Sequence, residues 1–450
     1  MKIRRQMVVL CLLLVVLTAA RAQYKEQDQQ PITFMEDGGW CWYEDPRVII
    51  HEGKLIIGTI SGVSGDIRVG VYDLEQNELE GVAVLDKAFE VDDHNSPVFY
   101  VREDGSLLAV WAKHGRENKH YYSISSPDNY LQWSERQVYT HDFDLPDGSS
   151  WGGVTYMNLY TIEKQGLLYN FYRNGPDLNP TYITSADGGN TWGHTTHLIK
   201  DEVAGKQRPY VRYMQLNDNQ IGISFTDGHP RVYGNSIYYA TFDGESFYRA
   251  NGEKIKSIAQ GPLQTSEAEK VYVGSETKEK PEGSGSVPDA AWTCDLEKDK
   301  KGNPHIGYTL FLENSDNRFR LASWTGKKWV DREIAYAGVG LYPREASYTG
   351  LIALDPEDPT RVIISTPVDP NTGEEKGVHE IYMARVKPKD DTQSIEWKQL
   401  TDNSTYKNIR PIIVAGDGYK VVLWLGGKPW THYQSFETSI MGYVLEKPKK

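Results

Sequence analysis

Two histidines, His94 and His114, flank a pair of apolar runs whose length and composition are typical of β-strands. The runs are Val98 to Val101 and Leu107 to Trp111, and the turn Glu103-Asp104-Gly105 joins them. A hairpin of this kind brings its outer ends together, so the two imidazoles are expected side by side. Adjacent imidazoles can move protons in acid–base catalysis. The alternative interpretation is two unrelated surface histidines.

Acidic, phenolic and guanidinium groups are available to work with these histidines. Asp92 and Asp93 precede the first histidine and can orient its ring and keep it basic by accepting an N–H. Tyr156 follows a pair of glycines that would let a ligand approach, and Arg173 ends an apolar strand. A tyrosine near an arginine can have its phenol pKa lowered, as a phenolate base or a proton-donating phenol requires. Tyr156 is the tyrosine we select for this role.

Further cationic and aromatic residues follow in the next part of the chain. Arg208, Tyr210 and Arg212 alternate, and a period of two places them on one face of a predicted strand. His229 stands at the end of a later strand, beside Gly and Pro. Convergence of successive strand ends on one axis would explain why such residues recur at these positions.

The composition favours short strands over helices. The chain has 29 Tyr, 12 Trp and 41 Gly among 450 residues, and it has almost no long amphipathic run at a period of 3.6. The stretch SADGGNTW, from Ser185 to Trp192, matches the Asp-box pattern S-x-D-x-G-x-T-W, a hairpin turn held by side-chain bonds to the loop backbone. Radial repetition of small sheets accommodates this length. We therefore predict an all-β fold, a β-propeller of seven blades with four antiparallel strands each and about 60 residues per blade.

The N-terminus has the features of a secretory signal peptide over residues 1–22. Basic residues precede an apolar run from Met7 to Leu17, and Ala20-Arg21-Ala22 is typical of a cleavage site. The apolar run is too short to span a bilayer. Residues 23–450 are therefore expected to form a single catalytic propeller domain that is secreted or periplasmic and does not insert into a membrane.

The net charge limits the possible binding partners, and the cysteine content limits the possible disulfides. The formal net charge is −13, which argues against nucleic acid and means that an anionic substrate needs a local basic pocket. Cys41 and Cys294 are the cysteines that remain after removal of the signal peptide. One disulfide between them and two buried thiols are both compatible with the sequence.

Several stretches resemble one family of exported polysaccharide lyases built on seven-bladed propellers with BNR-type repeats. This family includes ulvan lyases and the lyases that cleave L-rhamnose-α-1,4-D-glucuronate. The stretches are DDHNSPVFY with WAKHG, TYMNLY with NFYRNG, QRPYVRY with FTDGHPR, and YTGLIALDPEDPTRVIISTPVDP. The resemblance implies an acidic polysaccharide or oligosaccharide as substrate and proton transfer by His94 and Tyr156, with His114 beside them. It also implies a uronate carboxylate surrounded by Arg173, Arg208, Tyr210 and His229.

The residue types suit β-elimination from a 4-linked uronate. The C5 proton becomes acidic enough only when the carboxylate is neutralised and the developing charge is held by fixed donors. Glycoside hydrolysis usually asks for two positioned carboxylates instead. A propeller glycosidase, such as an α-L-rhamnosidase or sialidase, and a glycan-binding propeller without catalysis remain the alternatives. Elimination requires no cofactor, and a structural Ca or Zn ion is left open.

Overall fold

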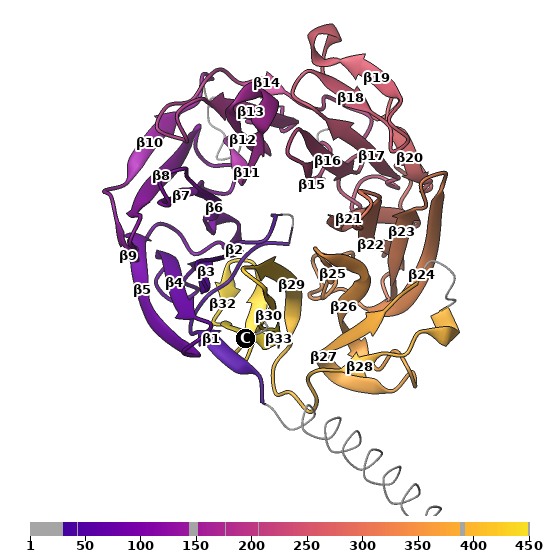
Figure 1. Ribbon diagram of the computed structural model, residues 1–450. Helices are drawn as coiled ribbons and strands as arrows, with labels where there is room; N and C mark the ends of the chain where they lie inside the picture. Colours follow the sequence, from indigo (N-terminus) through magenta and orange to yellow (C-terminus); the bar gives the residue numbers. More distant parts are fainter. Residues whose placement is uncertain are drawn as a thin grey trace, which may run out of the picture. The chain divides into compact units, whose positions relative to one another are not determined.

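The computed structural model describes residues 30–42, 44–143, 152–175, 177–205, 207–387 and 392–448. The predicted signal peptide at residues 1–22 lies outside these residues. Residues 33–450 cluster as one unit, in which the sheets follow one another around a central axis (Figure 1). The helical elements within the described residues are short 3₁₀ turns, η1 (Asp93–Asn95), η2 (Glu163–Gln165), η3 (Ile258–Gln260) and η4 (Thr392–Ser394). None of them is long and apolar enough to cross a membrane.

The first four blades are antiparallel sheets whose first strand lies nearest the axis (Figure 1). Blade one is β2 (Val48–His51), β3 (Lys54–Ile60), β4 (Ile67–Asp73) and β5 (Glu78–Asp86). Blade two is β6 (Val98–Val101), β7 (Leu107–Trp111), β8 (Lys119–Ser126), β9 (Asn129–Trp133) and β10 (Gln137–Thr140). Blade three is β11 (Thr155–Ile162), β12 (Leu167–Arg173), β13 (Pro180–Ser185) and β14 (Thr196–His197). Blade four is β15 (Val211–Asn217), β16 (Gln220–Phe225), β17 (Ile237–Phe242), β18 (Ser246–Tyr248), β19 (Lys254–Ser257) and β20 (Glu269–Tyr272).

The remaining blades complete the ring. Blade five is β21 (Ala290–Lys298), β22 (Pro304–Glu313), β23 (Asp316–Trp324) and β24 (Trp329–Gly338). Blade six is β25 (Ile352–Asp355), β26 (Asp358–Val368), β27 (Glu375–Arg385) and β28 (Lys398–Gln399). Blade seven is β29 (Ile409–Gly416), β30 (Tyr419–Gly426) and β33 (Ser439–Glu446), with β1 (Ile32–Met35) as its outer strand. A small hairpin, β31 (Trp430–His432) and β32 (Ser435–Phe436), projects between β30 and β33.

The seven-bladed all-β prediction is confirmed. Five of the seven sheets described have the predicted four strands, whereas blades two and four carry extra outer strands. Every residue of β7 is buried, because each blade packs against a neighbour on both of its faces. The Asp-box turn is also present: Asp187 accepts hydrogen bonds from the Thr191 backbone N–H at 2.9 Å and from the Thr191 hydroxyl at 2.7 Å.

The segment between β1 and β2 runs into the middle of the ring (Figure 1). There Arg47 forms an ion pair with Glu44 at 3.1 Å, and each side chain is only 1% exposed. Arg47 also donates to the Asn158 side-chain oxygen at 3.3 Å, which ties this segment to β11 of blade three. Because a buried charge needs its partner, the pair fixes the central segment in place.

Replacing Arg47 by Met is expected to lower the free energy of unfolding by about 3–5 kcal/mol, because Glu44 would keep a buried charge without a partner. Arg385→Met is the matched control, since the Arg385 side chain is 54% exposed and its ion pair with Asp358 lies at the surface. That variant should lose less than about 1 kcal/mol. Urea unfolding of both variants measures the difference, and equal losses would contradict the prediction.

Stability should also fall in mild acid because several histidines are buried in the neutral state. Burial lowers the pKa of each of five histidines below the ordinary 6.5, to about 3 or 4 for three of them: His120, His141, His229, His305 and His379. Between pH 6.5 and 5 the unfolded chain binds protons that the native protein excludes. Each histidine then removes up to about 1.4 kcal/mol of stability per pH unit. Urea unfolding across this range should show the loss, and His379→Gln should make it shallower; a free energy independent of pH would contradict this prediction.

Candidate functional site

The hairpin of β6 and β7 brings the two predicted histidines together. His94 lies in η1, just before β6, and His114 lies just after β7. Their rings are stacked, with centroids 3.5 Å apart and planes inclined by 10°. His94 is 4% exposed, whereas the His114 side chain is 16% exposed. The sequence pattern therefore locates a real pair of imidazoles at the inner edge of blade two.

Asp92 holds this histidine pair from one side. One carboxylate oxygen accepts from His94 Nδ1 at 2.7 Å, and the other lies 3.2 Å from His114 Nδ1. Gln434, which follows the hairpin strand β31, donates to the second oxygen at 2.9 Å. The carboxylate therefore fixes both rings through their Nδ1 atoms, so the Nε2 edge of a neutral ring carries the lone pair.

The charges of these three groups depend on one another. Burial opposes ionisation of Asp92, but His94 and His114 outweigh it and hold the pKa of the carboxyl below its usual range. Burial also disfavours a charged His94, yet Cys41, Tyr156 and Asp92 raise its pKa well above the ordinary value. Burial and the charge on His94 lower the pKa of His114 to about 4. His94 is therefore the ring of the pair that binds a proton more readily, and His114 is the ring that binds one less readily.

Tyr156 reaches the histidines because β11 is irregular. The pairing of β11 with β12 shifts between Thr155 and Asn158, and Tyr156 has a φ of 63°, in the left-handed region. Such a bulge redirects a side chain relative to regular alternation. The Tyr156 ring centroid lies 5.4 Å from that of His94 and 6.3 Å from that of Tyr210. Burial raises the pKa of Tyr156 well above its ordinary value, so the phenol keeps its proton.

Arg173 is the last residue of β12 and is held firmly beside Tyr210. Its Nε donates to the Leu178 carbonyl at 3.0 Å and its Nη1 to the Tyr210 hydroxyl at 2.9 Å. The guanidinium also lies over the Tyr210 ring, 4.4 Å from the centroid. Its Nη2 makes no hydrogen bond within the part of the chain that the structure describes. Arg173 is therefore an oriented cation with a donor to spare.

His229 lies on the other side of Tyr210, beneath Trp292. Its ring centroid is 5.8 Å from that of Tyr210 and 4.5 Å from that of Trp292. The Arg231 backbone N–H donates to His229 Nδ1 at 3.0 Å, and the Arg231 side-chain Nη2 lies 3.1 Å from His229 Nε2. That nitrogen lies 3.7 Å from a Glu345 carboxylate oxygen, while Arg231 contacts the other oxygen at 3.1 Å. Burial, with Arg231 and Arg173 nearby, lowers the pKa of His229 well below 6.5.

Arg208 and Arg212 differ from the predicted arrangement. Strand β15 begins at Val211, so the segment before it does not alternate as a strand. Arg208 Nε donates to the Asp177 carbonyl at 2.8 Å, and its Nη1 donates to the Gly205 carbonyl. Arg212 turns toward Asp295, at 3.4 Å. No contact joins Arg208 to the histidine pair in the described residues, whereas Tyr210 is joined to it through Tyr156.

Aromatic rings form a closed circuit that includes the site. Neighbouring centroids are 5.3–6.3 Å apart along the sequence of rings His94, Tyr156, Tyr210, Trp292, Tyr348, Tyr342, His432, Tyr433 and back to His94. The members come from six of the seven blades or the segments just before them. Five of these rings are buried, whereas the rings of Tyr342, His432 and Tyr433 are partly exposed.

Arg410, which the sequence analysis did not select, also contributes to the site. It comes from near the C-terminus and contacts residues from near the N-terminus. Arg410, 1% exposed in β29, donates to Asp93 Oδ2 and to the Trp40 carbonyl. Its guanidinium lies between the Trp42 and Trp430 rings, about 5 Å from each centroid.

Cys41 and Cys294 are both free and buried, so they do not form the disulfide that the sequence allowed.

Two groups of side chains near His94 have the chemistry of metal ligands. Cys41, Asp93 and His94 offer ligand atoms within 4.8 Å of one another, and so do Asp92, His94 and His114. The first group mixes sulfur, oxygen and nitrogen, whereas the second is already satisfied by hydrogen bonds to Asp92.

Comparison with known proteins places the fold. The sequence pattern of the BNR repeat-containing family matches residues 59–337, more than half of the chain. Among solved structures, a polysaccharide lyase PL25 ulvan lyase bound to a GlcA(1-4)Rha3S glycan has a TM-score of 0.60 at 15% identity, with 93% of this chain and 98% of that chain covered. The polysaccharide lyase Uly1 has a TM-score of 0.53 at 11% identity, with 93% and 94% covered. No curated protein matches the sequence.

Proposed function

This chain belongs to the BNR repeat-containing family, and from that premise we propose that it is a polysaccharide lyase acting on a 4-linked uronate glycan. The observation that carries the proposal is the link between an oriented arginine and a proton-handling group. Arg173 contacts Tyr210, Tyr210 lies against Tyr156, and Tyr156 lies against the stacked histidines. The structural likeness to two polysaccharide lyases supports the same class.

The uronate carboxylate is proposed to bind Arg173. The guanidinium is anchored through Nε and Nη1, so its remaining donor can meet an anion without reorganisation. The Tyr210 hydroxyl, which accepts from Arg173, can donate its own proton on the same side, and the His229 ring packs against Tyr210. Neutralising the carboxylate lowers the pKa of the C5–H bond and stabilises the enolate-like charge that develops during proton loss.

The histidine pair and Tyr156 are proposed to move the protons. His114, neutral and oriented by Asp92, takes the C5 proton; the negative charge of the bound substrate raises its basicity. Tyr156, which keeps its phenolic proton, donates it to O4 as the C4–O bond breaks. The electron pair of the C5–H bond becomes the C4=C5 double bond. His94 carries the charge that balances Asp92 and supports its partner ring.

The substrate is proposed to be an acidic plant or algal glycan met outside the cytoplasm. Candidate linkages are L-rhamnose-α-1,4-D-glucuronate in arabinogalactan-type glycans and the uronate linkage of ulvan. The aromatic circuit would hold sugar rings on both sides of the cleaved bond. The basic residues of this region sit on a chain of net charge −13, so they mark the local binding surface for an anion.

Glycoside hydrolysis is the second candidate, and Glu345 is the observation that favours it. Burial raises the pKa of this carboxyl, and its Oε2 accepts no hydrogen bond within the described residues. Glu345, whose pKa is raised, together with Asp92, whose pKa is lowered, would supply an acid and a carboxylate, as hydrolysis requires. Release of a saturated sugar would support this class.

One experiment separates these functions. The protein is incubated with ulvan and with a rhamnose-capped arabinogalactan, and ultraviolet absorbance and sugar release are followed together. A lyase produces a conjugated, unsaturated uronate that absorbs, and His94→Ala should abolish the signal. Saturated products would overturn the lyase proposal in favour of hydrolysis. Binding without any product would leave a non-catalytic glycan-binding propeller.

A further inference from the structure

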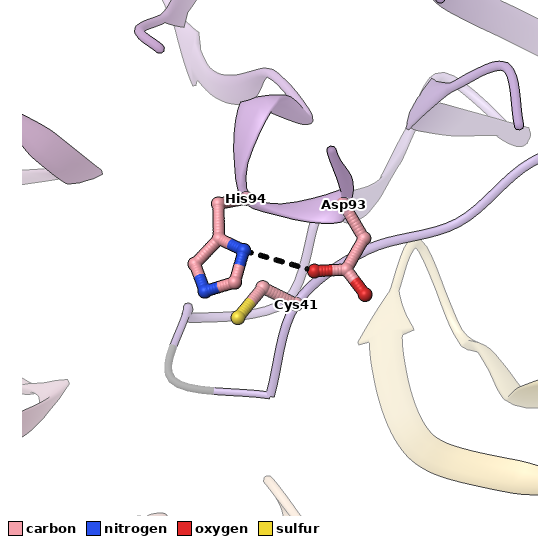
Figure 2. Close-up of side chains that lie close together, drawn as sticks. All are labelled: Cys41, Asp93 and His94. Carbon is pink, nitrogen blue, oxygen red and sulfur yellow. Dashed lines mark ion pairs between the residues drawn. The ribbon is translucent and has the colours of Figure 1, made fainter. Parts of the chain in front are cut away.

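We propose that Cys41, Asp93 and His94 bind one zinc-class divalent cation, and that this cation, by taking a ring nitrogen of His94, disturbs the stacked pair of His94 and His114. The first part stands on geometry alone, and the second rests on the proposed function. Figure 2 shows the three side chains, which converge from the central segment and from η1. Their ligand atoms lie within 4.8 Å of one another.

One of these ligand atoms is buried without a hydrogen bond. Asp93 is 0% exposed, and its Oδ2 accepts from Arg410. Its Oδ1 forms an ion pair with His94 Nδ1 at 3.1 Å, marked by the dashed line in Figure 2, but accepts no hydrogen bond within the described residues. A buried carboxylate oxygen without a hydrogen bond is costly, and a cation would satisfy it.

The donor set selects the kind of cation. A thiolate, an imidazole nitrogen and a carboxylate oxygen form a set that zinc binds with four-coordinate geometry, leaving one position for a further donor. Calcium and magnesium prefer oxygen ligands and would not recruit Cys41. Binding would displace the thiol proton from Cys41, so that Zn²⁺ and the neutral thiol give a zinc thiolate and one released proton.

Both halves of the site are held in place before any ion arrives. Cys41 is 2% exposed in the central segment, which Arg410 ties down at the Trp40 carbonyl. Asp93 is fixed through its backbone N–H, which donates to the Tyr433 carbonyl at 2.9 Å. Preorganised ligands bind a metal without a large ordering cost.

Metal binding has a direct consequence for the histidine pair. A cation on a ring nitrogen of His94 draws the ring away from its hydrogen bond with Asp92 and from its stack with His114. The proposed lyase would then be inhibited by stoichiometric zinc and restored by a chelator.

Cobalt substitution tests the site without reference to catalysis. After removal of metals with a chelator, Co²⁺ added to the full-length protein should produce a thiolate-to-metal charge-transfer band with a stoichiometry of one. Cys41→Ser should abolish that band and weaken metal binding about 100-fold or more. Cys294→Ser is the matched control, because Cys294 is equally buried, donates to the Trp292 carbonyl and lies in neither ligand group; it should keep the band.

The outcomes separate the two parts of the proposal. A wild-type protein without the band, or a band that survives Cys41→Ser, would overturn the metal site. Stoichiometric Zn²⁺ should reduce glycan cleavage by the wild type and by Cys294→Ser about 100-fold, but should leave Cys41→Ser active. Metal binding without inhibition would overturn the proposed disturbance of the histidine pair. If no glycan is cleaved by any variant, the proposed lyase function fails while the cobalt result still decides the site.

Discussion

Replacing Arg173 by lysine is expected to reduce kcat/KM for uronate cleavage about 100- to 1000-fold. The wild-type guanidinium reaches the Leu178 carbonyl, the Tyr210 hydroxyl and a bound carboxylate with different nitrogens of one rigid plane. An ammonium group cannot serve all of these positions at once, because it is a point charge on a flexible stem. The loss should therefore persist although the positive charge is kept. Initial rates of ultraviolet absorbance increase measure it.

Arg208→Lys provides the matched control for this substitution. Arg208 binds the Asp177 and Gly205 carbonyls and forms an ion pair with Glu202, at 3.4 Å, rather than turning toward Tyr156. The variant should keep kcat/KM within about tenfold of the wild type, as expected when a cation stabilises a loop instead of a transition state. A loss at Arg208 as large as that at Arg173 would show that the carboxylate lies elsewhere.

Tyr156→Phe is expected to lower kcat about 100- to 10,000-fold, with a smaller change in KM. The substitution keeps the ring that packs between His94 and Tyr210 and removes the phenolic proton proposed for O4. An effect confined to kcat identifies a group that acts in the transition state rather than in binding. Steady-state kinetics on one defined uronate oligosaccharide provide the measurement.

Tyr433→Phe is the control for the loss of a phenol from the same aromatic circuit. The Tyr433 ring packs edge-on against both histidines, with centroids 5.3 Å and 5.7 Å away, and the substitution keeps that packing. Its kcat should stay close to that of the wild type. If the two variants lose activity equally, Tyr156 is not the specific donor; if Tyr156→Phe remains active, proton donation must come from another group.

The sequence predicts the parts of this site that local patterns determine. His94 and His114 follow from one hairpin. Its two apolar runs and the Asp-Gly turn between them define the limits of its strands. Arg173 follows from its place at the end of an apolar strand. The blade count follows from length and from turns such as the Asp box. In these cases the relevant contacts lie close together along the chain.

Other features depend on irregular backbone or on distant contacts, and the sequence does not reveal them. A β-bulge with a positive φ at Tyr156 itself directs this side chain toward the histidines. A positive φ is usually signalled by glycine, and the sequence has a tyrosine at this position. The predicted face of Arg208 is not formed, because the strand begins three residues later, at Val211. Arg410 meets Asp93 across 317 positions of sequence, a contact that only closure of the ring creates.

Closure of the ring by β1 and β33 also determines when this site can exist during biosynthesis. Gln434 donates a hydrogen bond to the Asp92 side chain, and the Asp93 backbone N–H donates to the Tyr433 carbonyl. Residues that are synthesised early are therefore oriented by residues that are synthesised almost last. Domains fold from the N-terminus as the ribosome releases them, yet these bonds must wait for the final blade. A chain with six finished blades therefore has its histidines but not the residues that orient them, and the site is complete only when the last blade has formed.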